Sequence, residues 1–152
     1  MSAWRRKALE ALPEYRTELT SRWGFSVYSL FIEVLLPMVR EAHDAGNDDL
    51  LGRLYGYAAW CHEQPGKEPS NAVGVAFYEH LFDGGDRRAL DWLAPQTVRD
   101  VWGLYELMLP PDELCDLRRR AVARGIEGLP PLPPAPPKAG PAKPSVPHRS
   151  GP

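Results

Sequence analysis

Apolar residues recur along most of the chain at intervals of three and four, the spacing that places side chains on one face of an α-helix. One such run covers residues 27–42, with Ser26 in the N-cap position before it and Gly46 ending it. Pro37 lies inside the run and removes a backbone donor, so we expect a kink there. The pattern therefore predicts one long, irregular helix.

A second apolar stripe follows at residues 50–61, after Asn47 or Asp48 as the cap. The short link predicts that these two helices form an antiparallel hairpin. Ser70 then stands in the N-cap position of a third helix, which continues to Phe82 and is apolar on nearly all sides. We expect this to be the central helix of the fold. Further helices are expected at residues 3–12, 86–93, 95–109 and 111–124.

These elements predict an all-α protein, a compact bundle of antiparallel helical hairpins formed by residues 1–128. Residues 129–152 differ in kind, because they hold ten of the 17 prolines and three basic residues but no acidic one. Such a segment cannot bury a core, and we predict a disordered, proline-rich tail. A solubilising role is favoured for it over recognition of its PxxP spacings by SH3-type grooves.

Charge narrows the class of partner. The whole chain has a net charge of −2, and without the tail's three cations the folded part has 15 basic and 20 acidic residues, or −5. This balance argues against nucleic acid as a partner. The apolar run at residues 27–39 is too short to span a bilayer and contains Glu33, so we expect no membrane insertion and a cytoplasmic location.

Two polar residues of the expected central helix are the candidates for chemistry. Glu79 and His80 have apolar neighbours on the helical wheel, and buried groups of this kind can form acid–base sites. We favour a structural role in which Arg53 reaches inward to pair with a buried Glu79. Adjacent helical residues diverge by about 100°, so the two groups are poorly placed to act on one atom.

Other motifs are weak. The run Cys61, His62, Glu63 lacks the spacing of metal ligands, and we expect a buried structural Cys61 beside a solvent-facing His62. No catalytic, cofactor-binding or metal-binding residue is assigned. Tyr57 and Trp60 point away from the apolar stripe of their helix and are candidates for a contact face, although we favour the interpretation that they cover the neighbouring hairpin.

Three segments carry a resemblance to a known family: SLFIEVLLPMVREAH, DDLLGRLYGYAAWC and SNAVGVAFYEHLF. Together they resemble an uncharacterised family of small bacterial helical proteins, known as a domain of unknown function, over residues from Leu9 to about Leu117. The resemblance implies a helical fold and brings no catalytic residues. The AFYEHL pattern is also similar to that of some helical immunity proteins of bacterial toxin systems.

Two functional hypotheses follow. The first is a non-enzymatic protein-interaction module with another protein as its partner, of which an immunity-like protein is one form. The alternative is a small enzyme or ligand-binding protein that uses Glu79 and His80 in a pocket between helices. A cavity that reaches both side chains would favour the alternative, and a filled core around them would favour the first.

Overall fold

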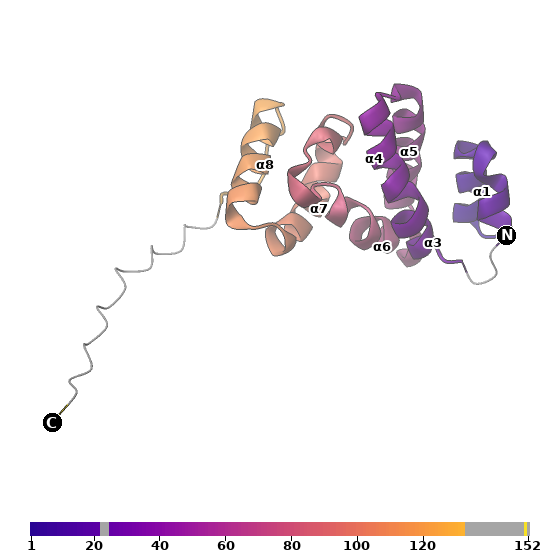
Figure 1. The fold of residues 1–152 in the computed structure, drawn as a ribbon, viewed down its shortest axis with the longest axis horizontal. Helices are drawn as coiled ribbons and strands as arrows, with labels where there is room; N and C mark the ends of the chain where they lie inside the picture. The colour runs from indigo at the N-terminus through magenta and orange to yellow at the C-terminus, as the bar shows by residue number, and fades with distance from the viewer. Residues whose placement is uncertain (22–24, 133–150, 152) are drawn as a thin grey trace.

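The helices are arrayed along the long axis of the molecule, with α1 at one end, the helices α3 to α7 between, and α8 at the other end (Figure 1). The computed structural model describes residues 1–21, 25–132 and 151. Within these residues there are helices and no strand, which confirms the all-α prediction. The elements are α1 (Ala3–Ala11), η1 (Pro13–Tyr15), α2 (Arg16–Ser21), α3 (Val27–Ser29), η2 (Leu30–Leu35), α4 (Leu36–Ala45), α5 (Asp48–His62), α6 (Lys67–Ala76), η3 (Tyr78–His80), η4 (Asp83–Gly85), η5 (Arg88–Asp91), α7 (Pro95–Met108) and α8 (Pro111–Ala123).

The predicted hairpin is formed by α4 and α5. Gly46 ends α4 in the left-handed conformation, with φ of 63°, and the Asn47 side chain accepts a hydrogen bond from the Leu50 amide at 3.2 Å. The irregularity expected near Pro37 takes the form of the π-helical segment η2. There the amide of Leu36 donates to the carbonyl of Phe31, five residues earlier, so the wider turn comes immediately before the proline.

The expected central helix is shorter and begins earlier than predicted. Its first residue is Lys67, Gly66 occupies the N-cap, and Ser70 lies inside the helix, so the assignment of Ser70 as the cap is wrong. Pro69 is tolerated because amides of the first helical turn have no partner within the helix. The helix ends at Ala76, where Phe77 has φ of −132° and ψ of −68°. Only short 3-10 turns follow it before α7.

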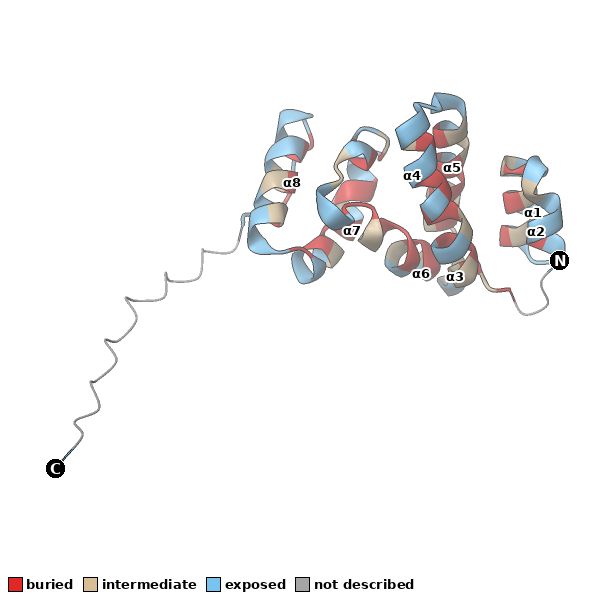
Figure 2. Ribbon diagram, in the orientation of Figure 1, coloured by how far each residue is buried: buried red, intermediate tan, exposed pale blue. Residues whose placement is uncertain are grey.

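The core contains a chain of aromatic rings that links the hairpin to α6 and the turns after it. Phe77 is fully buried, and its ring centroid lies 5.5 Å from that of Phe31 and 6.1 Å from that of Tyr55. Tyr55 stacks on Trp92 with centroids 5.8 Å apart. Buried residues face neighbouring helices while the outer faces are exposed (Figure 2). The motif residues Phe77 and Tyr78 are therefore parts of the core.

The helical body continues past α8. Gly125 ends that helix with φ of 94°, and the chain then buries Ile126 and Leu129. The carbonyl of Pro130 accepts a hydrogen bond from Nε of Arg118 at 3.0 Å. Residues 133–150 and 152 of the predicted tail lie outside the described residues, and the boundary at residue 128 stays a prediction.

Candidate functional site

A groove of about 830 Å³ lies between the end of α5, the connection to α6, and the helices α6 and α7. It is open to solvent on one side, and we call it the α6–α7 groove. Tyr28 of α3 closes part of one side. Its lining residues are Tyr28, His62, Gln64, Pro65, Gly66, Glu68, Ser70, Asn71, Gly74, Val75, Asp100, Val101 and Leu104.

One wall of the groove is apolar. Val75 of α6 is 37% exposed, and Leu104 of α7 is partly buried beside it. A Cβ atom built on Gly74 would lie 3.8 Å from Cδ1 of Leu104, so the two helices meet at ordinary contact distance here. Val101 is buried one turn before Leu104 and continues this wall. The groove thus offers aliphatic surface along α7.

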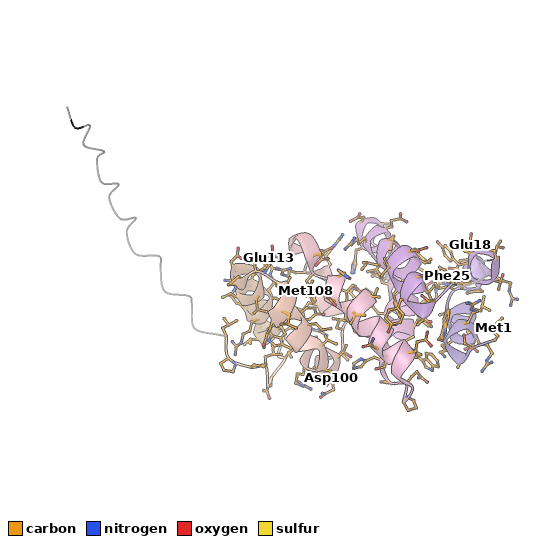
Figure 3. The ribbon with its side chains drawn as sticks, turned by 90° about the horizontal axis from the view of Figure 1, so that it is seen from below. Met1, Glu18, Phe25, Asp100, Met108 and Glu113 are labelled. Atoms are coloured by element: carbon orange, nitrogen blue, oxygen red, sulfur yellow. The ribbon has the colours of Figure 1, made fainter. Side chains whose placement is uncertain are left out.

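A polar pair lies at the edge of the groove. Nε2 of His62, the last residue of α5, lies 3.0 Å from Oδ2 of Asp100 on α7. The other oxygen of Asp100 accepts a hydrogen bond from Nε2 of Gln96 at 2.7 Å. The hydrogen bond with His62, followed by that from Gln96, lowers the pKa of Asp100 below its usual value. Asp100 is therefore an anion at neutral pH. It lies at the edge of the body in Figure 3.

Capping contacts hold His62 in place. The hydroxyl of Ser70 donates to the His62 carbonyl at 3.2 Å, and the Gln64 side-chain amide donates to the Trp60 carbonyl at 2.8 Å. These carbonyls belong to the last turn of α5, where no later amide of the helix can reach them. The His62 ring also meets Tyr78 edge-on, with centroids 5.8 Å apart. Its position is thus set by α5, α6 and η3 together.

A second polar pair lies on the α3 side of the groove. Nδ2 of Asn71 donates a hydrogen bond to the Tyr28 hydroxyl at 2.7 Å. A phenol that accepts one hydrogen bond still has its own O–H to donate, and a primary amide has two N–H groups. Tyr28 and Asn71 therefore present donor groups to whatever occupies the groove.

The sequence did not indicate this groove. His62 was expected to face solvent, but its side chain is only 21% exposed and pairs with Asp100, so that expectation is wrong. Tyr28, Asn71 and Asp100 were not singled out. The pairs that form the polar edges join residues 38 and 43 positions apart, and no spacing rule connects such positions.

The structure does not bring Glu79 and His80 together in this groove. Both lie on the 3-10 turn η3 and are partly buried, and neither is among the groove's lining residues. Nδ1 of His80 lies 3.0 Å from Oδ2 of Asp83. The carbonyl of His80 accepts a hydrogen bond from Arg40.

The expected pair between Glu79 and Arg53 is wrong for the described residues. Nη1 of Arg53 lies 2.7 Å from Oε1 of Glu14 and 3.1 Å from the carbonyl of Ala11. Ala11 is the last residue of α1, so Arg53 caps the carbonyl end of that helix. A hydrogen bond from its own backbone amide, followed by that from Arg53, lowers the pKa of Glu14. Arg53 thus ties α5 to the N-terminal segment.

Tyr57 is a core residue, so this candidate does not form a contact face. Its side chain is buried, and its hydroxyl donates to the Trp4 carbonyl of α1 at 3.0 Å. Trp60 is partly buried and stacks on Tyr57 with ring centroids 6.4 Å apart. The alternative that a neighbouring helix covers this face agrees with the packing of α1 on α5.

Cys61 is buried, as expected, and burial raises the pKa of its thiol to about 11. The thiol is therefore protonated and unreactive at neutral pH. Among the described residues, no group of three or more His, Cys, Asp and Glu side chains could hold a metal ion.

Comparison with known proteins identifies the family. A family model described as a domain of unknown function (DUF7674) matches residues 5–106, about two thirds of the chain. The chain belongs to this family. The match agrees with the resemblance seen in the sequence to an uncharacterised helical family. No curated protein and no solved structure matches the chain.

The DUF7674 region contains every lining residue of the α6–α7 groove, because Tyr28 and Leu104 both fall within residues 5–106. Helix α8 and the proline-rich segment follow after it. In the part of the chain that the structure describes, no helix combines the length and the apolar character needed to cross a bilayer.

Proposed function

We propose that the protein is a non-enzymatic interaction module whose α6–α7 groove binds an extended segment of another protein. The observation that carries the proposal is the composition of the groove. An aliphatic wall formed by Val75, Val101 and Leu104 faces polar edges formed by the His62–Asp100 and Tyr28–Asn71 pairs. Extended peptides need such a surface, since their side chains require apolar contact and their carbonyls require donors.

Exposed apolar residues extend this surface along α7. Leu107 is 83% exposed and Met108 is 50% exposed, and they follow Leu104 at the helical spacings of three and four. Figure 3 shows Met108 in the half of the body that lies away from Met1. Contiguous apolar residues beside a groove are a feature of protein-interaction surfaces. The groove and the end of α7 could therefore contact one partner together.

Charge supports a partner with basic groups. The groove is lined by Glu68 and Asp100, and the folded part of the chain carries a net charge of −5. The same charge disfavours nucleic acid. An immunity-like role is one form of this proposal, in which the bound segment would belong to a bacterial toxin. The proposal places the protein in the cytoplasm.

The alternative of an enzyme has less support from the geometry. Glu79 and His80 do not line the groove, and His62 is the imidazole that does. Its Nε2 is engaged by Asp100, and its Nδ1 is buried without a hydrogen-bond partner among the described residues. A general base needs a nitrogen that faces the substrate. This arrangement favours a binding role for His62.

The proposal is tested with random peptides of about 16 residues displayed on phage and selected against the immobilised full-length protein. Selected peptides should bind in the micromolar range and shift the amide NMR signals of Gly66, Asn71 and Leu104. Val75→Asp should weaken binding about tenfold, a change of about 1.4 kcal/mol. The matched control is Val122→Asp, since Val122 is exposed on α8, and it should leave the affinity unchanged. Peptides that bind elsewhere, or the absence of any binder, would contradict the proposal.

A further inference from the structure

The chain contacts α7 and then α8 where it leaves the helical body. The carbonyl of Glu127 accepts a hydrogen bond from Nη1 of Arg99 at 3.1 Å, and Arg99 is the neighbour of Asp100 on α7. Gly128 lies against the same arginine, because a Cβ atom built on it would be 3.5 Å from Cδ of Arg99. Residues 127 and 128 are thus fixed to the helix that forms one wall of the groove.

The remaining chain is long enough to reach the groove. Twenty residues, 133–152, follow the last consecutive described position. A chain of this length spans about 60 Å when extended as polyproline II. A helix with its side chains is only about 10–12 Å across, so the segment is long enough to pass from α8 around α7.

The chemistry of the segment complements that of the groove. Proline has no N–H, so a proline-rich chain presents mainly carbonyl acceptors and pyrrolidine rings. The groove offers the matching groups, namely the Tyr28 hydroxyl and Asn71 amide as donors, and Val75 and Leu104 as apolar contacts. Seven of the 18 residues 133–150 are proline, so backbone carbonyl acceptors outnumber N–H donors in the segment.

Charge is complementary as well. The segment contains Lys138, Lys143 and Arg149 and no acidic residue. The groove contributes Glu68 and the anionic Asp100, and its lining includes no Lys or Arg among the described side chains. Since the two are joined covalently, even a weak attraction acts at an effective concentration of about 1 mM.

We propose that the chain's own C-terminal segment, residues 133–150, docks in the α6–α7 groove and competes with the partner for it. This inference rests on the proposed function of the groove as a peptide-binding surface. An intrinsic Kd of about 100 μM at an effective concentration of about 1 mM would keep the segment docked about 90% of the time. A partner must then bind the groove tightly enough to displace the docked segment.

The test uses the full chain with a nitroxide spin label at Ser145→Cys. The exposed Cys115 is replaced by serine, whereas buried Cys61 is left in place because its thiol is protected. Paramagnetic broadening should strongly weaken the amide signals of Gly66, Asn71 and Leu104 and spare that of Gly52 on α5. Glu68→Gln with Asp100→Asn should abolish the broadening. The matched pair Glu41→Gln with Asp91→Asn changes the net charge equally at exposed positions outside the groove, and should preserve it.

A mixed sample identifies the origin of the segment. Spin-labelled protein without ¹⁵N is added to ¹⁵N-labelled protein without a spin label, and docking within one chain predicts no broadening. Broadening that appears in this mixture would assign the occupant to a second copy and overturn the proposal. Absent broadening in the single-species sample, or broadening of another surface, would overturn it too.

A second measurement separates this inference from the proposed function. Truncation after Leu132 should raise the affinity of a phage-selected groove peptide about tenfold, because the competing segment is gone. If such peptides bind the groove with unchanged affinity after truncation, the docked segment is refuted while the groove's function stands. If the spin label reports docking but no library peptide binds, the docked segment stands and the proposed binding of another protein fails.

Discussion

Nε2 of His62 lies 3.0 Å from Oδ2 of Asp100, and this contact joins the last residue of α5 to the first half of α7 at the edge of the α6–α7 groove. Asp100 is exposed and also accepts from Gln96, so the pair is in contact with water. Pairs of this kind contribute at most about 1 kcal/mol to stability. The main effect of the His62–Asp100 pair is to fix the polar edge of the groove.

Phe77→Ala should lower the free energy of unfolding by about 3–5 kcal/mol. The side chain is fully buried and contacts the rings of Phe31, Tyr55 and Tyr78, so its removal leaves a cavity that rigid neighbours cannot fill. Urea unfolding followed by circular dichroism measures the loss. Val75→Ala, two residues earlier and exposed, should stay within about 0.5 kcal/mol of the wild type. A loss below about 1 kcal/mol for Phe77→Ala would place the core elsewhere.

Two tyrosines provide a matched comparison. Tyr57→Phe removes the hydrogen bond to the Trp4 carbonyl and should cost about 1–2 kcal/mol. Tyr105 is also buried, but its hydroxyl has no hydrogen-bond partner among the described residues. Tyr105→Phe should therefore be neutral or slightly stabilising, since it removes a buried polar atom. Equal losses in thermal unfolding of both variants would show that this difference in hydrogen bonding is absent in solution.

Arg53→Met should cost about 1–2 kcal/mol, because it leaves the Ala11 carbonyl and Glu14 without their cation. Hydrogen exchange of the α1 amides should accelerate more than that of α7. Glu79→Gln should change stability by no more than about 0.5 kcal/mol, as expected for a residue outside any ion pair of the described chain. A large loss for Glu79→Gln would restore the buried pair that the sequence suggested.

His43 should make stability depend on pH. Burial, followed by the charge of Arg88, lowers its pKa in the folded state below the ordinary 6.5, while Asp86, Asp44 and Asp48 partly oppose the shift. Between the two pKa values the unfolded chain binds the proton and the folded protein does not. The contribution is therefore fully present above pH 6.5, is lost as the pH falls below it, and is constant below the folded-state pKa.

The His43→Gln variant isolates this contribution. Urea unfolding of both proteins from about pH 8 to about pH 5 should show the stability of the wild type falling relative to the variant on acidification. The hydrogen bond between Nε2 of His43 and the Tyr55 hydroxyl, at 2.8 Å, keeps the ring in its partly buried site. Parallel stability curves over this range would contradict the shifted pKa.

Two truncations test how far the folded body extends. Removal of residues after Leu132 should lower stability by no more than about 1.5 kcal/mol, the contribution of a weakly docked segment. Removal after Gly125 also deletes buried Ile126 and Leu129 and should cost several kcal/mol more. Differential scanning calorimetry measures both. Similar losses in the two proteins would mean that the body ends at α8.

The helix boundaries set by local signals were predictable. Gly46 ends α4, and Pro95 and Pro111 begin α7 and α8, because the conformational limits of glycine and proline act within one turn of chain. The end of α6 was not predictable in this way. Phe77 leaves helical geometry although neither glycine nor proline stands next to it, and its ring then packs between other aromatic rings of the core.

The errors at Tyr57 and Arg53 have one cause. The helical wheel of α5 correctly places Tyr57 away from the stripe that faces α4, but it carries no information that α1 covers the opposite side. Arg53 bonds α1 and η1 for the same reason. The groove also depends on contacts between segments that are distant in sequence. His62 and Asp100 meet only after α6 and the turns between them are in place.

The arrangement of the helices along one axis bears on how the domain forms. Most neighbours in space are near neighbours in sequence, such as α4 with α5 and α5 with α6 (Figure 1). Little loop-closure entropy is lost before such contacts form, and topologies of this kind fold fast. The hydrogen bond from Tyr57 to Trp4 is different, because it joins positions 53 residues apart. During synthesis, α1 can therefore form this contact only after the end of α5 has left the ribosome. Each later helix can pack on a neighbour that has already been synthesised.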